Sequence, residues 1–424
     1  MTSTTSFKSV SVVGLGYIGL PTAAMFASRR VPVVGIDVNQ HAIDTINQGR
    51  IHIVEPELDM LVHAAVHEGL LRATSKPEPA DAFLIAVPTP FKGEHEPDLA
   101  YVEAAARSIG PVLKKGDLVV LESTSPVGTT EQMVQWLAQE RPDLKFPFHA
   151  ADNCDVHVAY CPERVLPGQV VRELVQNDRV IGGITPRCSE RACELYRVFV
   201  QGELLVSNAR TAEMCKLTEN AFRDVNIAFA NELSMICDRL DIKVWDLIRL
   251  ANHHPRVKIL QPGTGVGGHC IAVDPWFIVD KTPEQARLIK TARVVNDGKP
   301  EWVVAKVREA VDELVREGRS PESIRIGIFG LAFKPNIDDL RESPALHIAE
   351  ALVRTLKGQF LVVEPNVEQP PRSLAEYELC RTEAALARAD VVVLLVAHRE
   401  FAELAQAVRT GQRVVDAVGL LNRR

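Results

Sequence analysis

The sequence has few of the features that mark nucleic-acid-binding, membrane or secreted proteins. Aromatic residues make up only 5%, no block of five or six like charges occurs, and the most apolar run, residues 391–397, is too short to span a bilayer. The N-terminal ten residues lack the apolar core of a secretory signal peptide. With a formal charge of −7, these absences argue against nucleic acid and membrane surfaces as partners and predict a cytoplasmic protein.

Cysteine is present but not in the arrangements that hold metals or disulfide scaffolds. The eight cysteines are scattered singly along 424 residues, and no CxxC pair occurs. We therefore predict no metal site, and reduced thiols that behave mostly as small buried hydrophobes. A chemically active cysteine has to be argued from its own neighbours.

The first half of the chain alternates strand-like and helix-like segments. At roughly 100–200 residues per domain, 424 residues predict about two to four domains. Residues 10–13, a glycine turn, a helical stretch at 19–29 and an apolar run at 31–36 form one βαβ pattern. Further strand-length apolar runs lie at 82–87, 118–121 and 156–160. This order predicts a mostly parallel sheet covered by helices on both faces.

The second half begins with helices and returns to the α/β pattern. Helical periodicity covers much of 209–252 and again 300–316, and the GRSPES loop that follows is the best candidate boundary. The expected strands after it are 325–329, 360–363, 391–396 and 413–417. The predicted fold class is α/β, with two Rossmann-like doubly wound domains joined by a long central helical segment. The expected ranges are 1–205, 206–316 and 317–424.

Three glycines follow the first expected strand and open the first helix. Gly14, Gly16 and Gly19 fit the GxGxxG pattern, in which missing side chains let backbone amides approach a pyrophosphate. Asp37 ends the next strand about 20 residues later, where a carboxylate accepts hydrogen bonds from an adenosine ribose. The negative charge favours NAD over NADP. The alternative is an ordinary glycine turn followed by a strand-end aspartate.

Polar motifs follow several of the expected strands. They are VPTP with Thr89, ESTSPVGTT with Thr124 and Thr130, and CPERVLPG with Glu163 and Arg164. Ligands of open α/β sheets bind beyond the carboxyl ends of the strands, so these motifs are candidates for one shared site. Each threonine alone is more often a helix cap or a turn residue.

The central helical stretch carries three polar residues at helical spacing. Lys216, Asn220 and Arg223 fall at i, i+4 and i+7, which puts them on one stripe of the helix. The alternative to a functional stripe is a solvated helix face, which is the commoner case.

A glycine-rich loop leads to Cys270. Four glycines occupy residues 263–268, so the backbone can turn tightly and leave the thiol open to a ligand. A thiolate there needs a cationic neighbour or a helix N-terminus, and Lys216 is a candidate. His269 is adjacent, but neighbouring side chains point apart, which disfavours hydrolytic Cys–His chemistry. An inert cysteine is the alternative, and Asp274 four residues on argues against it.

These motifs together resemble the UDP-glucose/GDP-mannose dehydrogenase family over nearly the whole chain. The segments that carry the resemblance are VGLGYIGLP, VPTP, ESTSPVGTT, CPERVLPG, EMCKLTENAFRDVNIAFANE, PGTGVGGHCIAVDP and GLAFKPNIDDLRESPA. The resemblance implies an enzyme that oxidises the C6 hydroxymethyl group of a UDP-sugar to a carboxylate with two NAD⁺. CPERVLPGQ, NHHPRVKILQPG and GGHCIAVDPWF point to UDP-N-acetyl-D-mannosamine as the sugar.

The resemblance also implies roles for individual residues. The expected catalytic residues are Cys270 as nucleophile, Lys216 and Asn220 at the C6 oxygen, Asp274 and Thr124 at the hydrolytic water, and Glu163 as base. The expected NAD-binding residues are Gly14, Gly16, Tyr17, Ile18, Gly19, Asp37, Thr89, Thr124, Thr130 and Arg341. The expected substrate-binding residues are Arg164, Val165, Lys216, Asn220, Arg223, His254, Arg256, Gly267, Phe333 and Lys334. A homodimer joined through the central helix is also implied.

One position departs from the family pattern. A D-x-[KR] element is usual near the C-terminus, whereas this chain has Asp416-Ala417-Val418. The loss of a charged substrate contact would cost roughly 1–3 kcal/mol of binding energy. UDP-N-acetylglucosamine and UDP-glucose remain alternative substrates, and a non-catalytic nucleotide-sugar-binding protein is the alternative from another class.

Overall fold

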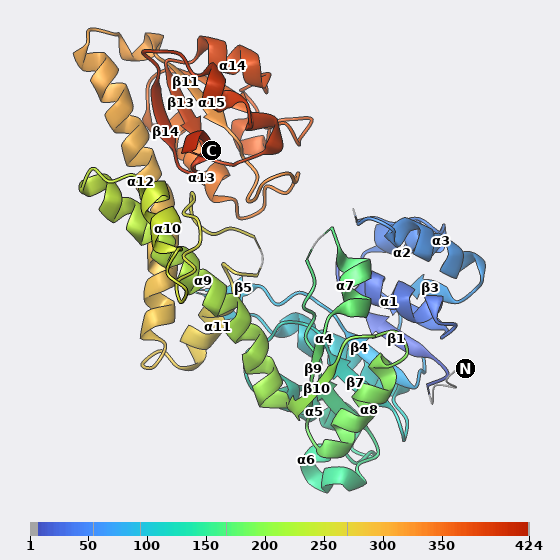
Figure 1. Ribbon diagram of the computed structural model, residues 1–424. Helices are drawn as coiled ribbons and strands as arrows, with labels where there is room; N and C mark the ends of the chain where they lie inside the picture. The colour runs from blue at the N-terminus through green and yellow to red at the C-terminus, as the bar shows by residue number, and fades with distance from the viewer. Residues whose placement is uncertain (1–6, 54, 94, 167, 269, 423–424) are drawn as a thin grey trace. The chain divides into compact units, whose positions relative to one another are not determined.

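The computed structural model describes residues 7–422 apart from residues 54, 94, 167 and 269. The chain forms two compact units, Met1–Glu219 and Asn220–Arg424, and the division falls within the long helix α9 (Ala209–Arg239). Figure 1 labels many of the helices and strands of both units.

The first unit is built on an eight-stranded sheet in the order β10-β9-β8-β7-β4-β1-β2-β3. Its strands are β1 (Val10–Val13), β2 (Val33–Ile36), β3 (Leu71–Thr74), β4 (Ala82–Ile85), β7 (Leu118–Leu121), β8 (His157–Tyr160), β9 (Arg179–Gly183) and β10 (Leu204–Asn208). Neighbouring strands are parallel except for β8 and β9, which are antiparallel. A separate short hairpin joins β5 (Phe91–Lys92) to β6 (Glu96–Pro97).

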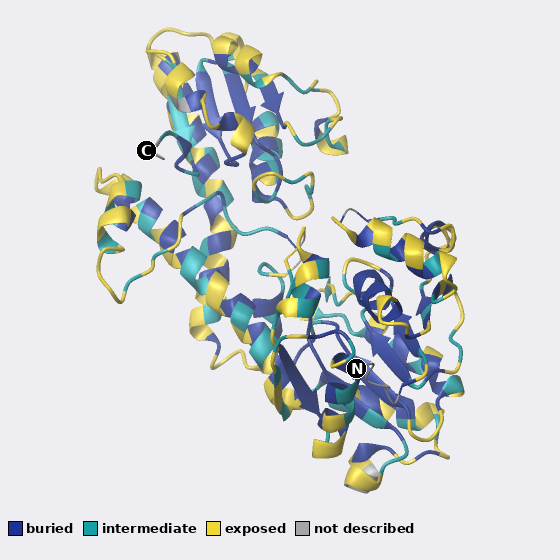
Figure 2. Cartoon of the chain, turned by 45° about the vertical axis from the view of Figure 1, so that its right-hand side comes forward, coloured by how far each residue is buried: buried dark blue, intermediate teal, exposed yellow. Residues whose placement is uncertain are grey.

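Helices cover both faces of this sheet. They are α1 (Gly19–Ser28), α2 (Gln40–Asn47), α3 (Leu58–His67), α4 (Ala100–Ile109), α5 (Thr129–Glu140), α6 (Pro147–Ala150), α7 (Val170–Gln176) and α8 (Pro186–Tyr196). Alternate residues of a strand enter different cores, since Val120 packs in one cluster and Val119 and Leu121 in the other. Figure 2 shows these strands buried between helices whose outer faces are exposed. The predicted parallel, two-sided sheet is confirmed.

The strand register brings the ends of five strands to one edge of the sheet. Val13 pairs with Ile36 and Ile85, Ile85 pairs with Leu121, and Leu121 pairs with Tyr160. Each is the last residue of its strand. The loops that follow these strands therefore share an edge, as expected for a parallel sheet that binds ligands at its carboxyl end.

The second unit combines helices with a four-stranded parallel sheet of order β12-β11-β13-β14. Its further elements are α10 (Val244–Ala251), α11 (Asp274–Lys281), α12 (Arg287–Arg316), β11 (Arg325–Phe329), α13 (Pro344–Thr355), β12 (Gln359–Val363), α14 (Thr382–Arg388), β13 (Val391–Leu394), α15 (Leu404–Ala407) and β14 (Arg413–Asp416). Residues Ile328 and Phe329 face two different cores, so this sheet is also covered on both faces. The prediction of a second Rossmann-like sheet is confirmed.

Helix α12 differs from the prediction of a helix at 300–316. It starts at Arg287, and Pro300 lies inside it. An internal proline removes one helical hydrogen bond and usually breaks a helix. Here Arg293 and Asn296 bond the buried Asp224 of α9, and Lys299 donates to Ser234 at 2.6 Å. These bonds to α9 hold the turns that lead up to the proline.

The two units repeat one local design. Gly14 after β1 and Gly330 after β11 have positive φ angles of 91° and 95°. The next backbone N–H in each case donates to an acid at the end of the neighbouring strand: Leu15 to Asp37 at 2.8 Å, and Leu331 to Glu364 at 2.7 Å. The segments VGLG (residues 13–16) and FGLA (residues 329–332) are similar in sequence because both form the same kind of turn after a strand.

Candidate active site

The glycine turn of the first unit leaves one open position. A Cβ atom on Gly14 would lie 2.5 Å from the Ala86 carbonyl oxygen, and one on Gly19 would lie 1.7 Å from the Gly14 oxygen. Both positions therefore require glycine for packing. Gly16 is exposed and has nothing within 4 Å of its Cβ position, so a ligand can approach its backbone closely. Tyr17, which is 41% exposed, and the half-buried Ile18 border this open position.

Asp37 is oriented by two backbone groups at this turn. Its Oδ2 accepts from the Leu15 N–H at 2.8 Å, and its Oδ1 accepts from the Asn39 N–H at 2.8 Å. The side chain is only partly buried, and each oxygen keeps a lone pair for another donor. A fixed carboxylate beside an open glycine fits the adenosine ribose and pyrophosphate of NAD.

Two of the predicted motifs meet through a hydrogen bond. Thr89 Oγ1 donates to the backbone oxygen of Thr124 at 2.6 Å. The VPTP and ESTSP loops are thereby joined, and both threonines remain partly exposed at the same edge of the sheet. Their proximity agrees with the expectation of a shared site, while their contacts to ligands remain a prediction.

Thr130 is held in a buried environment that the sequence did not reveal. Its Oγ1 and backbone N–H donate to Glu213 Oε1 at 2.6 and 2.8 Å, and the Gly128 N–H donates to Glu213 Oε2 at 2.6 Å. Glu213 thus caps the N-terminus of α5 from helix α9. Burial raises the pKa of Glu213, and these hydrogen bonds oppose the shift. Its position three residues before Lys216, on the same helix, was the available clue. The predicted contact of Thr130 with NAD stays a prediction.

Glu163 is a buried carboxyl group with an unused oxygen. It is 8% exposed, and no described residue donates a hydrogen bond to its Oε1. Burial raises the pKa of Glu163, while the charges of Lys216 and Arg179 oppose the rise. Such a group takes up and releases a proton nearer neutral pH than an exposed glutamate does.

A second buried acid, missed in the sequence, lies in the same network. Burial raises the pKa of Glu122 to about 7, and the charge of Glu163 adds to the rise while Arg179 and Tyr196 oppose it. The Tyr196 hydroxyl donates to Glu122 at 2.6 Å. Glu122 is the first residue of ESTSP, so its place directly after β7 was the available clue. The negative charge of Glu163 makes it harder for Glu122 to lose its proton. The two buried acids are therefore not readily charged at the same time.

Arg164 and Val165 follow Glu163 on the loop after β8. The Arg164 guanidinium pairs with Glu219 at 2.8 Å and donates to the Asp178 backbone oxygen at 3.1 Å. Val165 packs against the core of the first unit. Lys216 is partly buried on α9 and interacts electrostatically with Glu163. A lysine and a carboxyl with a raised pKa are thus neighbours in one unit.

The cysteine loop of the second unit ends in a buried polar pair. Cys270 is exposed, and its backbone oxygen accepts from the Asp274 N–H at 2.9 Å. Asp274 begins α11, is 3% exposed and accepts a hydrogen bond from the Asn220 amide. The structure therefore links Asn220, Asp274 and the backbone of Cys270. His269 lies outside the described residues.

The glycines before Cys270 allow close contact with the loop after β11. A Cβ atom on Gly267 would lie 2.3 Å from the Glu342 backbone oxygen and 3.0 Å from Phe333 Cβ. Gly268, with a φ of 82°, approaches the Phe333 ring in the same way. This contact brings together Gly267 and Phe333, two predicted substrate residues. Lys334 Nζ lies 5.8 Å from the centre of the Phe333 ring.

The remaining predicted site residues are exposed. Arg223 projects from α9, and the backbone N–H of Arg256 donates to His254 Nδ1 at 3.3 Å in the loop after α10. Arg341 pairs with Asp339 at 2.6 Å in the second unit. Their contacts with substrate or NAD stay predictions.

Val418, at the departure from the family pattern, has a packing role. It is partly buried against the core cluster that contains Phe329 and Leu361. Asp416, two residues earlier, accepts hydrogen bonds from the backbone of Val418, Leu420 and Leu421. An apolar side chain at 418 therefore suits this local fold.

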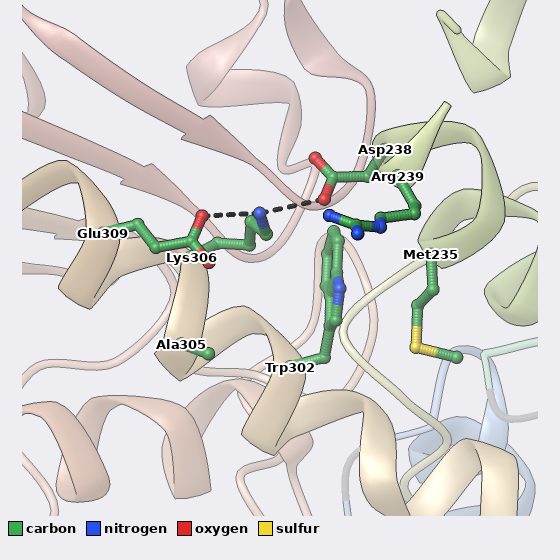
Figure 3. A pocket seen from close by; sticks show the side chains of 7 residues that line it. All are labelled: Met235, Asp238, Arg239, Trp302, Ala305, Lys306 and Glu309. Atoms are coloured by element: carbon green, nitrogen blue, oxygen red, sulfur yellow. Dashed lines mark hydrogen bonds and ion pairs between the residues drawn. The ribbon is translucent and has the colours of Figure 1, made fainter. Parts of the chain in front are cut away.

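A hollow elsewhere in the second unit does not coincide with these residues. It lies between α9 and α12, and Figure 3 shows the residues that line it. Lys306 bridges Asp238 at 2.9 Å and Glu309 beside the Trp302 ring. None of the predicted site residues lines it, so it is not the candidate active site.

The fold and these features define a class of protein. A doubly wound sheet with an open glycine turn and an oriented strand-end acid is the framework of a dinucleotide-dependent oxidoreductase. The exposed thiol on a glycine loop supplies a nucleophile that simple alcohol dehydrogenation does not need.

Comparison with known proteins defines the family. Residues 8–200 match the NAD binding domain of the UDP-glucose/GDP-mannose dehydrogenase family, residues 210–298 its central domain, and residues 327–423 its UDP binding domain. The chain is 64% identical over 417 residues to the UDP-N-acetyl-D-mannosamine dehydrogenase of Yersinia pestis, covering 98% of this chain and 99% of that one. It is also 64% identical over 414 residues to the NDP-N-acetyl-D-galactosaminuronic acid dehydrogenase of Ralstonia nicotianae, covering 98% and 96%.

A solved structure agrees with this assignment. The UDP-D-ManNAc dehydrogenase of Pyrococcus horikoshii superposes with a TM-score of 0.87 at 38% identity, covering 98% of this chain and 96% of that one. The chain belongs to the UDP-glucose/GDP-mannose dehydrogenase family. It is an enzyme that uses NAD, and the glycine turn and Asp37 fit that cofactor. No described helix has the length and apolar character needed to cross a bilayer.

Proposed function

We propose that this enzyme oxidises UDP-N-acetyl-D-mannosamine at C6 to UDP-N-acetyl-D-mannosaminuronate. The observation that carries the proposal is the exposed Cys270 thiol, whose loop is bonded to the buried Asp274–Asn220 pair. The choice of sugar is supported by the names of relatives that are 64% identical over almost the full chain.

The thiol explains how an alcohol can be taken to a carboxylate in one site. Loss of two electrons and two protons converts the C6 alcohol to an aldehyde. The Cys270 sulfur adds to the aldehyde carbon to give a thiohemiacetal, and a second two-electron oxidation gives a thioester. Water then cleaves the C–S bond, which releases the carboxylate and restores the thiol. When bound, NAD accepts each electron pair as a hydride.

The other catalytic roles follow from charge and hydrogen bonding. Lys216 exchanges the proton of the C6 oxygen and, with the amide of Asn220, stabilises negative charge that develops on it. Asp274 and Thr124 position the hydrolytic water. Glu163 removes a proton from that water, a role supported by its buried, unpartnered oxygen and raised pKa.

The binding residues divide between cofactor and sugar nucleotide. We assign NAD contacts to Gly14, Gly16, Tyr17, Ile18, Gly19, Asp37, Thr89, Thr124, Thr130 and Arg341. We assign substrate contacts to Arg164, Val165, Lys216, Asn220, Arg223, His254, Arg256, Gly267, Phe333 and Lys334. The open face at Gly16 supports the first group, and the Gly267–Phe333 contact supports the second.

Electron stoichiometry tests this proposal. We expect two NADH for each UDP-N-acetyl-D-mannosamine consumed, because alcohol and aldehyde each lose one electron pair. NADH absorbance and identification of a uronic acid product by mass spectrometry measure the ratio. A ratio of one with a ketone or aldehyde product would contradict the four-electron reaction. UDP-sugar binding without any NADH formation would contradict the proposed oxidation of this sugar.

A substrate panel tests the choice of sugar. UDP-N-acetylglucosamine and UDP-glucose are the alternative substrates, and the Ralstonia relative adds an N-acetylgalactosamine nucleotide. The proposal holds if kcat/KM is highest for UDP-N-acetyl-D-mannosamine. A higher value for another sugar would reassign the substrate while leaving the chemistry at Cys270 intact.

We also propose that the enzyme is a homodimer joined through α9. Large apolar side chains recur every seven residues on this helix: Phe222 is 67% exposed, Phe229 51% and Ile236 46%. This spacing puts them on one face, and exposed apolar stripes of this kind mark interfaces between proteins. A second copy of α9 presents the same apolar face, so the two helices would bury these side chains against each other.

Negative charge placed on this apolar face of α9 should separate the subunits. We expect Phe222→Asp with Phe229→Asp to convert the dimer to a monomer, because two carboxylates would be desolvated at the interface. Light scattering coupled to gel filtration measures the mass. Glu232→Gln, at an exposed position of the same helix, is the control. A dimer that survives the double substitution would contradict this interface.

Two further assignments remain part of the proposal. The division into an NAD-binding region at 1–205, a central region at 206–316 and a UDP-sugar-binding region at 317–424 stays a prediction. The cytoplasm is the proposed location, supported by eight cysteines that are all thiols in the structure.

A further inference from the structure

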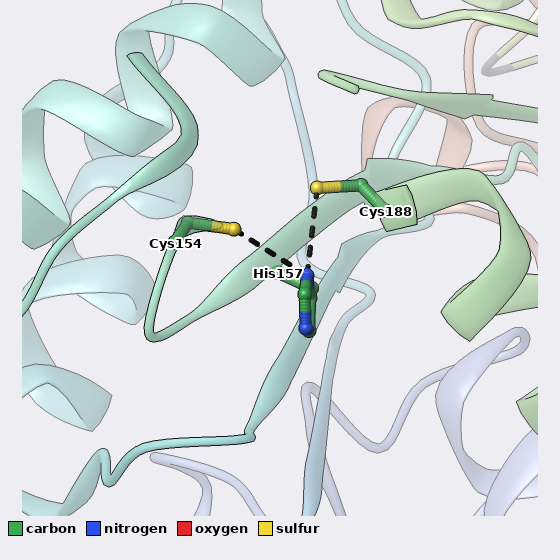
Figure 4. A group of neighbouring side chains, drawn as sticks. All are labelled: Cys154, His157 and Cys188. Carbon is green, nitrogen blue, oxygen red and sulfur yellow. Dashed lines mark hydrogen bonds between the residues drawn. The ribbon is translucent and has the colours of Figure 1, made fainter. Parts of the chain in front are cut away.

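Two cysteines and a histidine converge in the first unit, apart from the proposed catalytic residues. Cys154 Sγ lies 3.4 Å from His157 Nδ1, and Cys188 Sγ lies 3.9 Å from the same nitrogen. All three atoms are within 4.8 Å of one another. Figure 4 shows both sulfur atoms directed at the imidazole. Cys188 is fully buried, and the other two residues are half-buried.

The two cysteines also hydrogen-bond to each other, but the imidazole nitrogen cannot form a good hydrogen bond to both sulfur atoms. The Nδ1 atom of a neutral imidazole either donates one hydrogen or accepts with one lone pair, so it forms one good hydrogen bond. Here two sulfur atoms approach it. The Cys188 sulfur already accepts from the Val158 N–H at 3.4 Å and the Thr185 hydroxyl at 3.3 Å. Both contacts suit a sulfur that carries negative charge.

A tetrahedral metal ion would satisfy all three groups at once. With Zn–S of about 2.3 Å and Zn–N of about 2.0–2.1 Å, the ligand atoms around Zn²⁺ lie roughly 3.5–3.8 Å apart. The sulfur–nitrogen distances of 3.4 and 3.9 Å are close to this spacing. We propose that Cys154, His157 and Cys188 bind Zn²⁺. Two thiolates neutralise the ion, and the half-buried side of the cluster leaves a fourth position for water.

The topology explains how the three residues meet. His157 begins β8, and Cys154 precedes it in the adjoining loop. Strand β9 runs antiparallel to β8, so α8, which follows β9, starts near the amino end of β8. Cys188 lies in the first turn of α8, where the Thr185 side chain caps the helix. The reversal of one strand thus brings the third ligand to the other two.

The position of the cluster indicates a structural role for the metal. His157 pairs with Leu118 at the amino ends of β8 and β7, whereas Thr124 and Glu163 follow the carboxyl ends of the same strands. The metal would therefore lie at the opposite edge of the sheet from the proposed catalytic residues. It would tie the loop before β8 to the start of α8.

This inference departs from the sequence-based expectation of no metal site. Cys154 and His157 are three residues apart, which is a common ligand spacing, but a pair alone does not define a site. The third ligand lies 31 residues after His157. Only the antiparallel pairing of β8 with β9 reveals that Cys188 lies close to His157.

Cobalt substitution tests the site in the full-length protein. A Cys270→Ser background removes the exposed catalytic thiol, which would otherwise bind metal. After reduction and removal of metals by a chelator, Co²⁺ is added alone. We expect a thiolate-to-cobalt charge-transfer band that saturates at about one equivalent and is displaced by Zn²⁺. Zn²⁺ should also raise the Tm of this protein.

Variants assign the band to the three residues. Cys154→Ser and Cys188→Ser should each weaken Zn²⁺ binding by at least about 100-fold and remove the band. Cys193→Ser, a buried cysteine on the same helix α8, is the matched control and should retain both. Circular dichroism checks folding, and the half-buried Cys154 is the safer substitution. No band in the reduced parent protein, or a band that survives both ligand variants, would overturn the proposal.

Discussion

We expect Cys270→Ala to lower the rate of uronate formation by about a thousand-fold or more, while binding of NAD and UDP-sugar persists. Without the sulfur, the aldehyde cannot be held as a thiohemiacetal. The second oxidation then lacks the covalent intermediate on which it acts. The residue is exposed, so its loss removes little packing and leaves Tm nearly unchanged. NADH absorbance measures turnover, and titration calorimetry measures binding of each nucleotide.

The matched control for this substitution is Cys215→Ala. Cys215 is a half-buried thiol on α9 with no proposed role in the chemistry. We expect its activity to stay within about two-fold of the parent enzyme, since surface-proximal substitutions have small effects. Undiminished uronate formation by Cys270→Ala would remove the thiohemiacetal and thioester from the mechanism.

Much of the fold follows from short-range patterns in the sequence. The expected bounds of β1, β7 and β11 coincide with those observed, because each is a short, mostly apolar segment that is largely buried between helices. The relation between the glycine turn and Asp37 was also predictable. Parallel neighbours with aligned ends must bring the end of β2 to the turn after β1.

Other features depend on contacts that no local pattern reveals. Strands β9 and β10 were not predicted, because β9 contains two glycines and β10 is mostly exposed. Gly182 and Gly183 are nevertheless required there, since Cβ atoms would lie 2.5 Å from the Asn208 oxygen and 2.4 Å from the Ser189 nitrogen. The reversal at β9 is also what brings Cys188 to His157.

The sequence motifs name candidate site residues, but they do not reveal the contacts that surround them. The motifs named Glu163 and Thr130, whereas their environments come from Arg179 and Glu213, which lie in other segments. Burial depth decides how a carboxyl group behaves, and it is set by long-range packing. The role of Glu163 as a base therefore rests on the structure more than on its motif.

Glu163→Gln should stop the reaction at the thioester. Glutamine keeps the size of the side chain but cannot accept a proton from water, so hydrolysis should slow by about 100-fold or more. The two oxidations do not need this group, so a burst of NADH close to two per active site should precede the slow phase. Intact-protein mass spectrometry should detect the sugar nucleotide bound to Cys270, and Cys270→Ala should abolish that adduct.

The pH dependence gives an independent readout of Glu163. Because burial raises its pKa, the fraction of active carboxylate increases with pH through that raised value, and steady-state turnover of the parent enzyme should rise with it. In the Glu163→Gln variant, turnover should no longer rise with pH through this range. Its Tm at neutral pH should be equal or higher, because a buried acid with a raised folded-state pKa destabilises the fold once the pH exceeds its unfolded value. A variant that folds normally but shows neither thioester accumulation nor an altered pH profile would exclude Glu163 as the base.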